Sequence, residues 1–326
     1  MMTIKNVLVT GCCGFVGAAT CRGLVNAGHN VAGIDDNINA GINQFRAGTN
    51  GLSSNIKLDI PRLFRYGLDE KYLFEGGKFD AIIHLAAIPG VRDSIRDPKL
   101  YYRNNLIGTL NILELMLEYE IPKLVFASTS SVYDWSNAPY KPIGERTQFV
   151  KPRHPYAGSK LAAEDLCRMY HELHGLDVSV LRYFTVYGPS GRPDMFPLRA
   201  VRWACEGEPI QLNGDGSQER DFTYIDDVVD ANIRAVNHEA GFEVFNIGAG
   251  VPFSLVELIG CIEEKKEYPQ VNYGPGNNLD ANFTWADNSK ARDLLGWEPE
   301  TTLYEGIRKT VEWYRENRAA LKDIKF

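Results

Sequence analysis

The segment HPYAGSK, from His154 to Lys160, places a tyrosine four residues before a lysine. Four residues are about one helical turn, so the side chains of Tyr156 and Lys160 would share one face of a helix. A phenol has an ordinary pKa of about 10, and a neighbouring ammonium favours the phenolate, which brings the tyrosine into range for proton transfer. The alternative interpretation is an exposed helix start, so the pair needs support from the rest of the chain.

A second motif, GCCGFVG, spaces Gly11, Gly14 and Gly17 directly after the apolar run NVLVT. Such glycines let the backbone turn sharply and let a pyrophosphate approach the N-terminus of the next helix, where free amides favour an anion. Asp35 and Asp36 end the next apolar run, where a carboxylate can accept a hydrogen bond from a ribose hydroxyl. Because carboxylates there would repel a phosphate, the pattern predicts NAD rather than NADP. The alternatives are a glycine turn without ligand and aspartates that cap a loop.

The elements that must position these residues alternate between short apolar runs and helical patterns. Strands are predicted at 6–10, 30–35, 79–86, 123–128 and 178–184, and helices at 15–27, 100–119, 156–174 and 301–326. Apolar strands joined by helices predict an α/β fold, a doubly wound parallel (Rossmann) sheet covered on both faces. Segments rich in glycine, proline and charge follow Gly188. We therefore expect a Rossmann domain at 1–186 and a smaller C-terminal α/β lobe at 187–326.

Composition narrows the classes of function. The chain has 326 residues, is 44% hydrophobic and carries a formal net charge of −7. A nucleic acid would require a basic surface, so we expect no nucleic-acid partner. No stretch approaches the roughly 20 apolar residues that cross a bilayer, and the first residues lack the layout of a signal peptide. We expect no membrane partner and a cytoplasmic location.

The cysteines and histidines do not suggest a metal site. The six cysteines show no paired CxxC spacing, and the adjacent Cys12 and Cys13 are poorly placed to form a disulfide with each other. The six histidines are scattered, without an HExxH pattern. We expect buried, reduced thiols and no metal.

Five motifs in order resemble the extended short-chain dehydrogenase/reductase family, and within it the nucleotide-sugar epimerases: GCCGFVG, HLAA (84–87), FASTSSVYD (126–134), PYAGSK and RDFTYIDD (220–227). The resemblance covers nearly the whole chain. It implies that the first domain holds NAD, that segments near 223–235 and 243–249 return to that domain, and that the C-terminal lobe holds a nucleotide sugar. It also implies a homodimer through the helices at 100–119 and 156–174. By position, the implied cofactor contacts are Gly11, Gly14, Phe15, Val16, Gly17, Asp35, Asp36, Asp59, Ile60, Leu85, Ala86, Ala87, Asn104, Tyr156, Lys160 and Phe184.

The resemblance also implies catalytic roles. Tyr156 would be the general base, Lys160 would tune it and hydrogen-bond the nicotinamide ribose, and the hydroxyl of Thr129 would bridge the sugar oxygen. Tyr156 would take the proton of the 4-hydroxyl while hydride passes from carbon four to NAD. If the 4-keto sugar rotates in the pocket so that its other face meets the nicotinamide, hydride returns to that face. Carbon four is then inverted, and NAD is regenerated.

The residues after Thr129 indicate which reaction follows. Relatives that dehydrate the sugar carry an Asp-Glu pair there, and decarboxylating relatives carry a glutamate at the position of Ser131. This chain has Ser130 and Ser131, so simple epimerisation is favoured. The hydroxyls of these residues and of Thr185 are small donors that suit a sugar carboxylate. Because GVRDS (90–94) and GPSGRPDM (188–195) also resemble UDP-glucuronate 4-epimerases, conversion of UDP-glucuronate to UDP-galacturonate is favoured.

The remaining substrate contacts are expected from charge and position. Arginines must supply local positive charge for the diphosphate in a chain of net −7. The expected substrate-binding residues are Arg92, Thr129, Ser130, Ser131, Thr185, Arg192, Leu212, Asn213, Arg220 and Asp280. Two departures stand out: Asp134 and Trp135 follow Tyr133 where many relatives have glycine next, and Asn277 stands where relatives have an arginine.

Other functions stay open at this point. One is 4-epimerisation of UDP-glucose or UDP-N-acetylglucosamine, and another is a dehydratase or other lyase on the same scaffold. A third is a non-catalytic NAD-binding regulator, although a sensor would not need Tyr156, Lys160 and Thr129 together.

Overall fold

The computed structural model describes residues 5–36, 55–57, 78–239, 241–262, 269–276, 281–322 and 324. The chain divides into two compact units. The first unit comprises residues 1–134, 150–182 and 229–245, and the second comprises residues 135–149, 183–228 and 246–326. The second unit thus includes residues 135–149 and 183–186, which were predicted to belong to the first domain.

A seven-stranded sheet forms the centre of the first unit among the described residues, in the order β10-β6-β5-β4-β1-β2-β3. Its strands are β1 (Asn6–Thr10), β2 (Asn30–Asp35), β3 (Asn55–Lys57), β4 (Ala81–His84), β5 (Lys123–Thr129), β6 (Asp177–Tyr183) and β10 (Phe242–Ile247). The pairings of β1 with β2 and with β4 are parallel, as are those of β2 with β3 and β4 with β5. This order reverses direction between β1 and β4, and in such sheets ligands bind at the carboxyl ends of the strands at that point.

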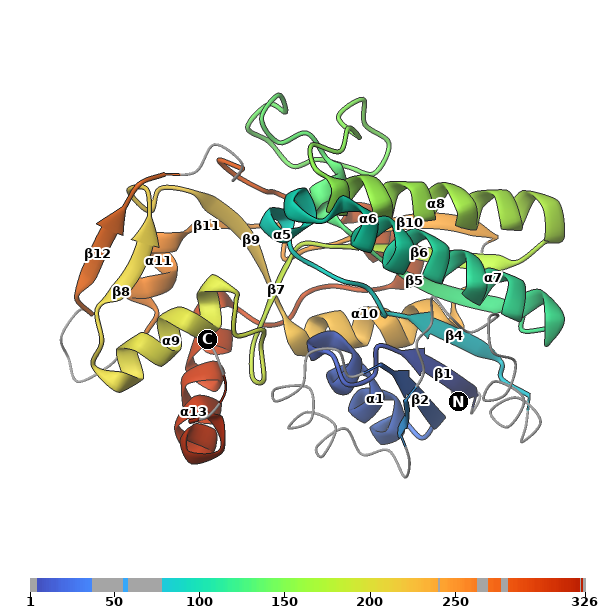
Figure 1. Cartoon of the computed structure of the whole chain (residues 1–326), viewed down its shortest axis with the longest axis horizontal. Helices are drawn as coiled ribbons and strands as arrows, with labels where there is room; N and C mark the ends of the chain where they lie inside the picture. The colour runs from blue at the N-terminus through green and yellow to red at the C-terminus, as the bar shows by residue number, and fades with distance from the viewer. Residues whose placement is uncertain are drawn as a thin grey trace. The chain divides into compact units, whose positions relative to one another are not determined.

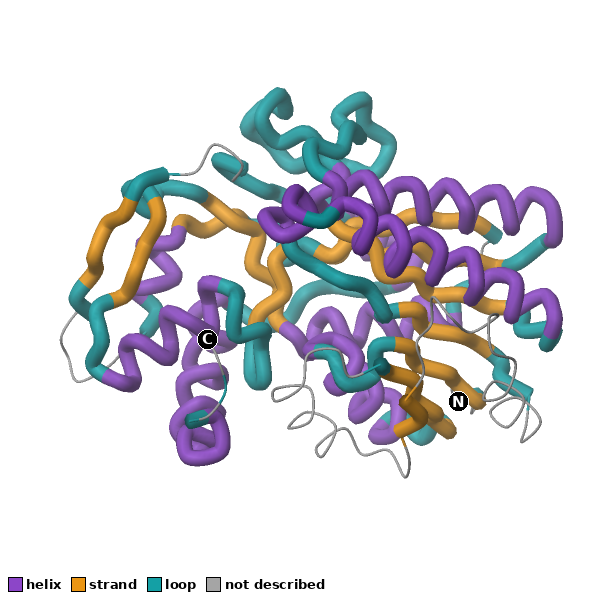
Figure 2. Tube along the Cα trace, viewed as in Figure 1, coloured by secondary structure: helices purple, strands orange, loops and turns teal. Residues whose placement is uncertain are grey.

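Helices cover both faces of this sheet (Figures 1 and 2). On one face lie α1 (Phe15–Asn26) and α10 (Ile225–Asn237), and on the other α7 (Gly108–Glu118) and α8 (Pro155–His174) run side by side. The second face packs on strand residues that are fully buried, including Leu8, Ile82 and Leu124. The burial of residues from both α7 and α8 in that cluster explains the helical spacing of their apolar residues.

The helix predicted at 100–119 is interrupted. Two short helices, α5 (Val91–Arg96) and α6 (Pro98–Tyr101), are followed by a π-helical turn, η2 (Tyr102–Ile107), before α7 begins. At this turn the side chain of Asn105 bonds the backbone of Ile88, 17 residues earlier in the chain, through both its oxygen and its nitrogen (2.8 and 3.1 Å). A wider turn of this kind is rare and often marks a functional site.

The second unit contains a three-stranded sheet, β11-β9-β7, and a two-stranded parallel sheet, β12-β8, within the described residues. Its strands are β7 (Thr185–Tyr187), β8 (Ile210–Asn213), β9 (Glu219–Tyr224), β11 (Pro252–Ser254) and β12 (Val271–Gly274), and its helices are α9 (Phe196–Glu206), α11 (Leu255–Gly260), α12 (Ser289–Leu295) and α13 (Leu303–Leu321). The helix predicted at 301–326 corresponds to α13, which begins after the capping side chain of Thr302. Gly306 lets α13 approach β7, because a Cβ there would lie 2.1 Å from the hydroxyl of Tyr187.

Among the described residues, no helix has both the length and the apolar character needed to cross a membrane.

Candidate functional site

The glycine-rich turn joins β1 to α1 in a conformation that needs glycine. Gly11 has φ +70°, and a Cβ on it would lie 2.7 Å from the amide nitrogen of Ala86. A Cβ on Gly17 would lie 2.0 Å from the carbonyl oxygen of Gly11. The first turn of α1, with Phe15 buried and Val16 half-buried, therefore starts directly above the strand end. Its first amides have no partner within the helix, which suits an anion.

Two aspartates end β2 beside this turn. Asp35 is buried, and its carboxylate accepts a hydrogen bond from the amide of Cys13 (2.8 Å), so it is tied to the turn itself. Asp36 is half-buried. Two further predicted cofactor contacts, Asp59 and Ile60, lie outside the described residues.

The thiols of Cys12 and Cys13 lie in the same turn, and none of the six cysteines, all of which are among the described residues, forms a disulfide. Their sulfur atoms are 3.8 Å apart, and both lie with a carboxylate oxygen of Asp35 inside a 4.8 Å cluster. The three groups are thus near enough to share a metal ion, which the scattered cysteine spacing did not indicate. All three are buried. Burial also raises the pKa of the nearby Cys21 to about 12.

A buried histidine organises the strand ends at the reversal point. His84, on β4, bonds the hydroxyls of Thr10 (2.7 Å) and Thr109 (3.1 Å), one through each ring nitrogen. Thr109 gives its own hydrogen to the carbonyl of Asn105 (2.7 Å), so it can only accept from His84, which makes Nε2 of His84 the donor in this bond. Burial lowers the pKa of His84 to about 3, and Lys160 adds to this effect.

The loop after β4 carries the predicted cofactor contacts Leu85, Ala86 and Ala87, all half-buried. The amide of Ala86 bonds the hydroxyl of Thr10 (3.2 Å), so the same threonine orients both the histidine and this loop.

The predicted contact Asn104 and its neighbour Asn105 have different environments. Asn104 is half-buried and bonds the carbonyl of Leu100 within its own helix (2.8 Å). Asn105 is fully buried and, besides Ile88, bonds the hydroxyl of Ser159 (3.1 Å), which donates to the carbonyl of Tyr156 (2.8 Å). Asn105 therefore connects the β4 loop to the helix that carries the tyrosine and lysine. The sequence YRNNLI (102–107) places two asparagines side by side, and only Asn104 was predicted to belong to the site.

Helix α8 presents the Tyr156–Lys160 pair. The ring of His154 caps its start by accepting from the amide of Ala157 (3.2 Å), and Pro155 suits the first helical position. Tyr156 is half-buried, with its ring edge-on to Tyr101 and parallel to His154.

Lys160 is almost fully buried. Its ammonium lies over the ring of Phe126, 4.1 Å from the centroid, and has no hydrogen-bond acceptor among the described residues. Burial lowers its pKa to about 8, although the nearby Cys167 and Glu164 favour the charged form. A ribose hydroxyl is an acceptor that the donors of this ammonium can bond, which fits the predicted dinucleotide.

Thr129 ends β5 and begins a short 3₁₀ turn, η3 (Ser130–Val132). Its hydroxyl accepts from the amide of Ser131 (3.1 Å) and is buried, as is Ser130, whereas Ser131 is half-buried. The predicted hydroxyls thus stand together at one strand end.

A buried ion pair behind this strand end was not predicted. Glu164 on α8 accepts two hydrogen bonds from Arg182 on β6 (3.0 and 2.6 Å), and both side chains are about 5% exposed. Arg182 also donates to the hydroxyl of Tyr133 (2.9 Å), and Ser128 donates to Glu164. Burial opposes the charge of Arg182, yet its bonds to Glu164 raise its pKa above the ordinary value.

The predicted residues of the second unit are more dispersed. Phe184 is buried, with its amide bonded to the carbonyl of Ile247 (3.0 Å), and Thr185 begins β7. On β8, Leu212 is buried and Asn213 is exposed. Asp280 and Asn277 lie outside the described residues.

The three predicted arginines differ in their surroundings. Arg92, in the first unit, is exposed on α5. Arg192 is held by both carboxylate oxygens of Asp194 (3.0 and 2.5 Å), so it is already paired. Arg220, on β9, is half-buried and bonds the carbonyl of Glu219 (2.8 Å).

Asp221, next to Arg220, supports this region in a way that the motif did not indicate. Its carboxylate accepts from the amides of Ala249, Gly250 and Ala286 (2.6 to 3.0 Å). Burial raises its pKa to about 7, against these amides, which favour the carboxylate.

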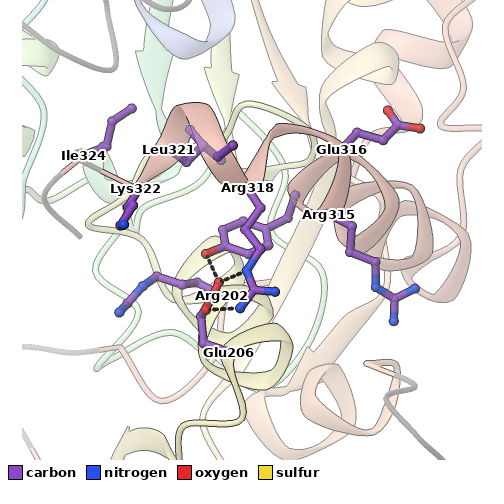
Figure 3. A pocket seen from close by; sticks show the side chains of 10 residues that line it. Arg202, Glu206, Arg315, Glu316, Arg318, Leu321, Lys322 and Ile324 are labelled. Atoms are coloured by element: carbon purple, nitrogen blue, oxygen red, sulfur yellow. Dashed lines mark hydrogen bonds and ion pairs between the residues drawn. The ribbon is translucent and has the colours of Figure 1, made fainter.

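A cavity of about 670 Å³ lies elsewhere in the second unit, beside α9 and α13 (Figure 3). Arg202, Glu206, Arg318 and Lys322 help to line it, and Glu206 accepts two bonds from Arg318 (2.8 and 2.6 Å) and one from Tyr314 (2.9 Å). None of the predicted site residues lines this cavity.

Comparison with known proteins gives consistent matches. The model of the NAD dependent epimerase/dehydratase family matches residues 7–248. A UDP-glucuronate 4-epimerase from Thermodesulfobacterium geofontis is 42% identical over 331 residues, covering 98% of each chain. The crystal structure of UDP-glucuronic acid 4-epimerase from Bacillus cereus, in complex with UDP-glucuronic acid and NAD, matches with a TM-score of 0.86 at 34% identity, covering 95% of this chain and 99% of that one. The structure of UDP-glucose 4-epimerase from Thermotoga maritima, with UDP-glucose, has a TM-score of 0.86 at 31% identity, covering 96% and 99%. The predicted doubly wound fold is confirmed.

Proposed function

The chain belongs to the NAD dependent epimerase/dehydratase family, and from that premise we propose that it inverts carbon four of UDP-glucuronate to give UDP-galacturonate. NAD, the predicted cofactor, is named in the family's description and in the Bacillus cereus complex. When bound, NAD accepts the hydride of carbon four and returns it to the opposite face of the ketone.

The observation that carries the proposal is the environment of Lys160. Its buried ammonium, one helical turn from Tyr156, has donors without acceptors among the described residues. We assign to it the hydrogen bond to the nicotinamide ribose and a positive charge near Tyr156 that favours the phenolate. Tyr156 then takes the proton of the 4-hydroxyl, and Thr129 holds the sugar oxygen.

We assign further cofactor contacts to predicted residues of the glycine turn, the β2 end and the β4 loop. The anchoring of Asp35 to the amide of Cys13 supports this, since it orients one carboxylate at the end of β2. The second unit is proposed to hold the nucleotide sugar, with Arg220 toward the diphosphate. Arg192 can bind the diphosphate only if it gives up its hydrogen bonds to Asp194.

The choice of UDP-glucuronate rests on neutral hydroxyls. Thr129, Ser130 and Ser131 stand at the turn after β5, where relatives that dehydrate or decarboxylate the sugar carry a carboxylate. Without a carboxylate there is no acid or base at this place for an elimination, and the hydroxyls are small donors that suit a sugar carboxylate. The 42% identical relative that is named a UDP-glucuronate 4-epimerase supports the same choice.

The test is the product formed from UDP-glucuronate, UDP-glucose and UDP-N-acetylglucosamine, each incubated with the purified protein. We expect a product of unchanged mass, with UDP-glucuronate giving the highest kcat/KM. A preference for either other sugar would transfer the assignment to that 4-epimerase. Loss of water or carbon dioxide would identify a lyase instead.

A matched variant separates an enzyme from an NAD-binding regulator. Tyr156→Phe removes one oxygen, and the ring contacts with Tyr101 and His154 do not require it. We expect NAD still to be bound and turnover to be lost. Undiminished turnover would remove Tyr156 from its role, and no turnover by the unaltered protein on any sugar would favour the regulator.

We also propose a homodimer through α7 and α8. Exposed apolar side chains on or next to these helices support such a surface, namely Ile107, Met169 and Leu173. Met116 of α7 is buried in the core and is not part of this surface. Leu173→Glu is expected to shift the mass measured by light scattering from dimer toward monomer. A monomeric unaltered protein would contradict the proposal.

A further inference from the structure

Two adjacent residues, Tyr133 and Asp134, follow the turn formed by Thr129 and η3 (Ser130–Val132), and each is linked to helix α8. We propose that they are positioning residues, which hold this turn in one geometry relative to Tyr156 and Lys160. The inference rests on the proposed function, because it concerns how that catalytic set is held.

Asp134 provides the first link. Its side chain is 3% exposed, and its carboxylate accepts a hydrogen bond from Arg153 (3.1 Å), which is half exposed. Arg153 immediately precedes His154, the residue that caps α8. The pair therefore joins the chain after the turn to the start of the helix, three residues before Tyr156.

Tyr133 provides the second link. Its buried hydroxyl accepts from Arg182 (2.9 Å), whose guanidinium also lies 5.1 Å from the centre of the tyrosine ring. The same guanidinium makes two bonds to Glu164, which lies on α8 four residues beyond Lys160. The second link therefore reaches the helix on the far side of the catalytic pair.

Together the two links bracket the helical stretch that carries Tyr156 and Lys160. A short backbone pairing lies between them: the amide of Lys151 bonds the carbonyl of Val132 (2.9 Å), and Tyr133 and Val150 form an antiparallel bridge. A rotation or slide of α8 against β5 would have to break one of these contacts. Such control is relevant because a displacement of about 1 Å can cost about 100-fold in rate. Neither Tyr133 nor Asp134 is assigned a contact with substrate or cofactor.

The first experiment compares kinetic constants of Tyr133→Phe and Asp134→Asn with those of the unaltered enzyme. We expect each to lower kcat roughly 10-fold or more, with KM and the amount of bound NAD within about 2-fold, because only the alignment in the transition state is lost. Arg153→Gln in the Asp134→Asn background should add little further loss, since both remove the same pair. Arg308→Gln breaks the exposed Arg308–Glu312 pair on α13 and serves as the control, with kcat within 2-fold.

Rescue by charge sharpens the test. Arg153→Lys keeps a cation beside the buried carboxylate and should retain most of the kcat that Arg153→Gln loses. If Asp134→Asn folds poorly, Tyr133→Phe tests the second link without changing a charge. Unchanged kcat in both Tyr133→Phe and Asp134→Asn would overturn the proposal, as would a loss of kcat that only parallels a loss of bound NAD.

Hydrogen exchange tests the links without relying on turnover. Asp134→Asn should speed exchange of the amides of residues 150–158, while exchange in residues 305–315 of α13 stays unchanged. Unaltered exchange at 150–158 would overturn the proposal even if the enzyme is active. If the unaltered protein fails to epimerise UDP-sugars, the proposed function fails, and faster exchange would still support the links.

Discussion

Two ion pairs of the same chemistry lie in the two units and differ in burial. Glu164–Arg182 in the first unit has side chains about 5% exposed and joins α8 to β6 behind Thr129. Glu206–Arg318 in the second unit has side chains 22% and 58% exposed and joins α9 to α13 beside the cavity. Both pairs use two hydrogen bonds. Removal of one partner should therefore be costly in the first pair, where the remaining charge stays buried, and mild in the second, where water replaces the lost partner.

The largest expected effect is on catalysis at the buried region. Tyr156→Phe should lower kcat by about 10²- to 10⁴-fold, the usual contribution of a general base, while melting temperature and bound NAD stay nearly unchanged. A steady-state assay with UDP-glucuronate and the ultraviolet spectrum of the released dinucleotide provide the measurement. A kcat within 10-fold of the unaltered enzyme would mean that another group takes the proton.

The buried pair itself is tested by Arg182→Met. We expect a loss of roughly 3–5 kcal/mol in the free energy of unfolding, because the carboxylate of Glu164 is left buried without its main partner. Urea unfolding measures this loss. Glu164→Met added to Arg182→Met should recover part of the stability, since no buried charge remains. If the double variant is less stable than the single one, desolvation is not the cause.

The protonation state of Lys160 makes both stability and kcat depend on pH. Its pKa of about 8 lies below the ordinary value of 10.5, so between pH 8 and 10.5 the unfolded state binds more protons than the folded state. The contribution of this group to stability therefore rises with pH across that window, whereas its ability to favour the phenolate is lost. We expect kcat to fall above about pH 8, and the stability advantage of Lys160→Met over the unaltered protein to shrink over the same range. A kcat that is constant to pH 10 would contradict the assignment.

His84 should make the first unit sensitive to acid. Its folded pKa of about 3 lies below 6.5, so the unfolded state binds the extra proton between these values and stability falls as pH falls. The slope from one such group is at most about 1.4 kcal/mol per pH unit. His84→Gln should unfold with a smaller dependence on pH between 6.5 and 3, measured by urea titrations. An unchanged slope would show that other groups dominate.

The smallest effect is expected at the exposed pair. Arg318→Met should change the melting temperature by less than about 2 °C and leave kcat unchanged, because the exposed pair is solvated whether or not it forms. A loss comparable with that of Arg182→Met would remove the contrast between the two regions.

Local patterns predicted the parts of the site that depend on nearby residues. NVLVT and GCCGFVG indicated β1 and the start of α1, because strand burial and a tight turn need those residue types at adjacent positions. The Arg182 partner of Glu164 was not predictable, since the two residues come from different elements and only the packed sheet brings them together. Asn105 was missed for a related reason: its side chain bonds the backbone of Ile88 and the hydroxyl of Ser159, which are distant in sequence, and it lies in a π-turn that helical spacing does not indicate.

In the proposed mechanism, carbon four loses and regains the same hydrogen within one turnover. The most direct measurement is the reaction of UDP-glucuronate with the enzyme in deuterium oxide, followed by mass and proton spectra of the product. After the exchangeable hydrogens have been restored in ordinary water, we predict UDP-galacturonate of unchanged mass with no deuterium on carbon four, because the hydride held by NAD does not exchange with solvent. Deuterium at carbon four, or a product that has lost water or carbon dioxide, would contradict the account.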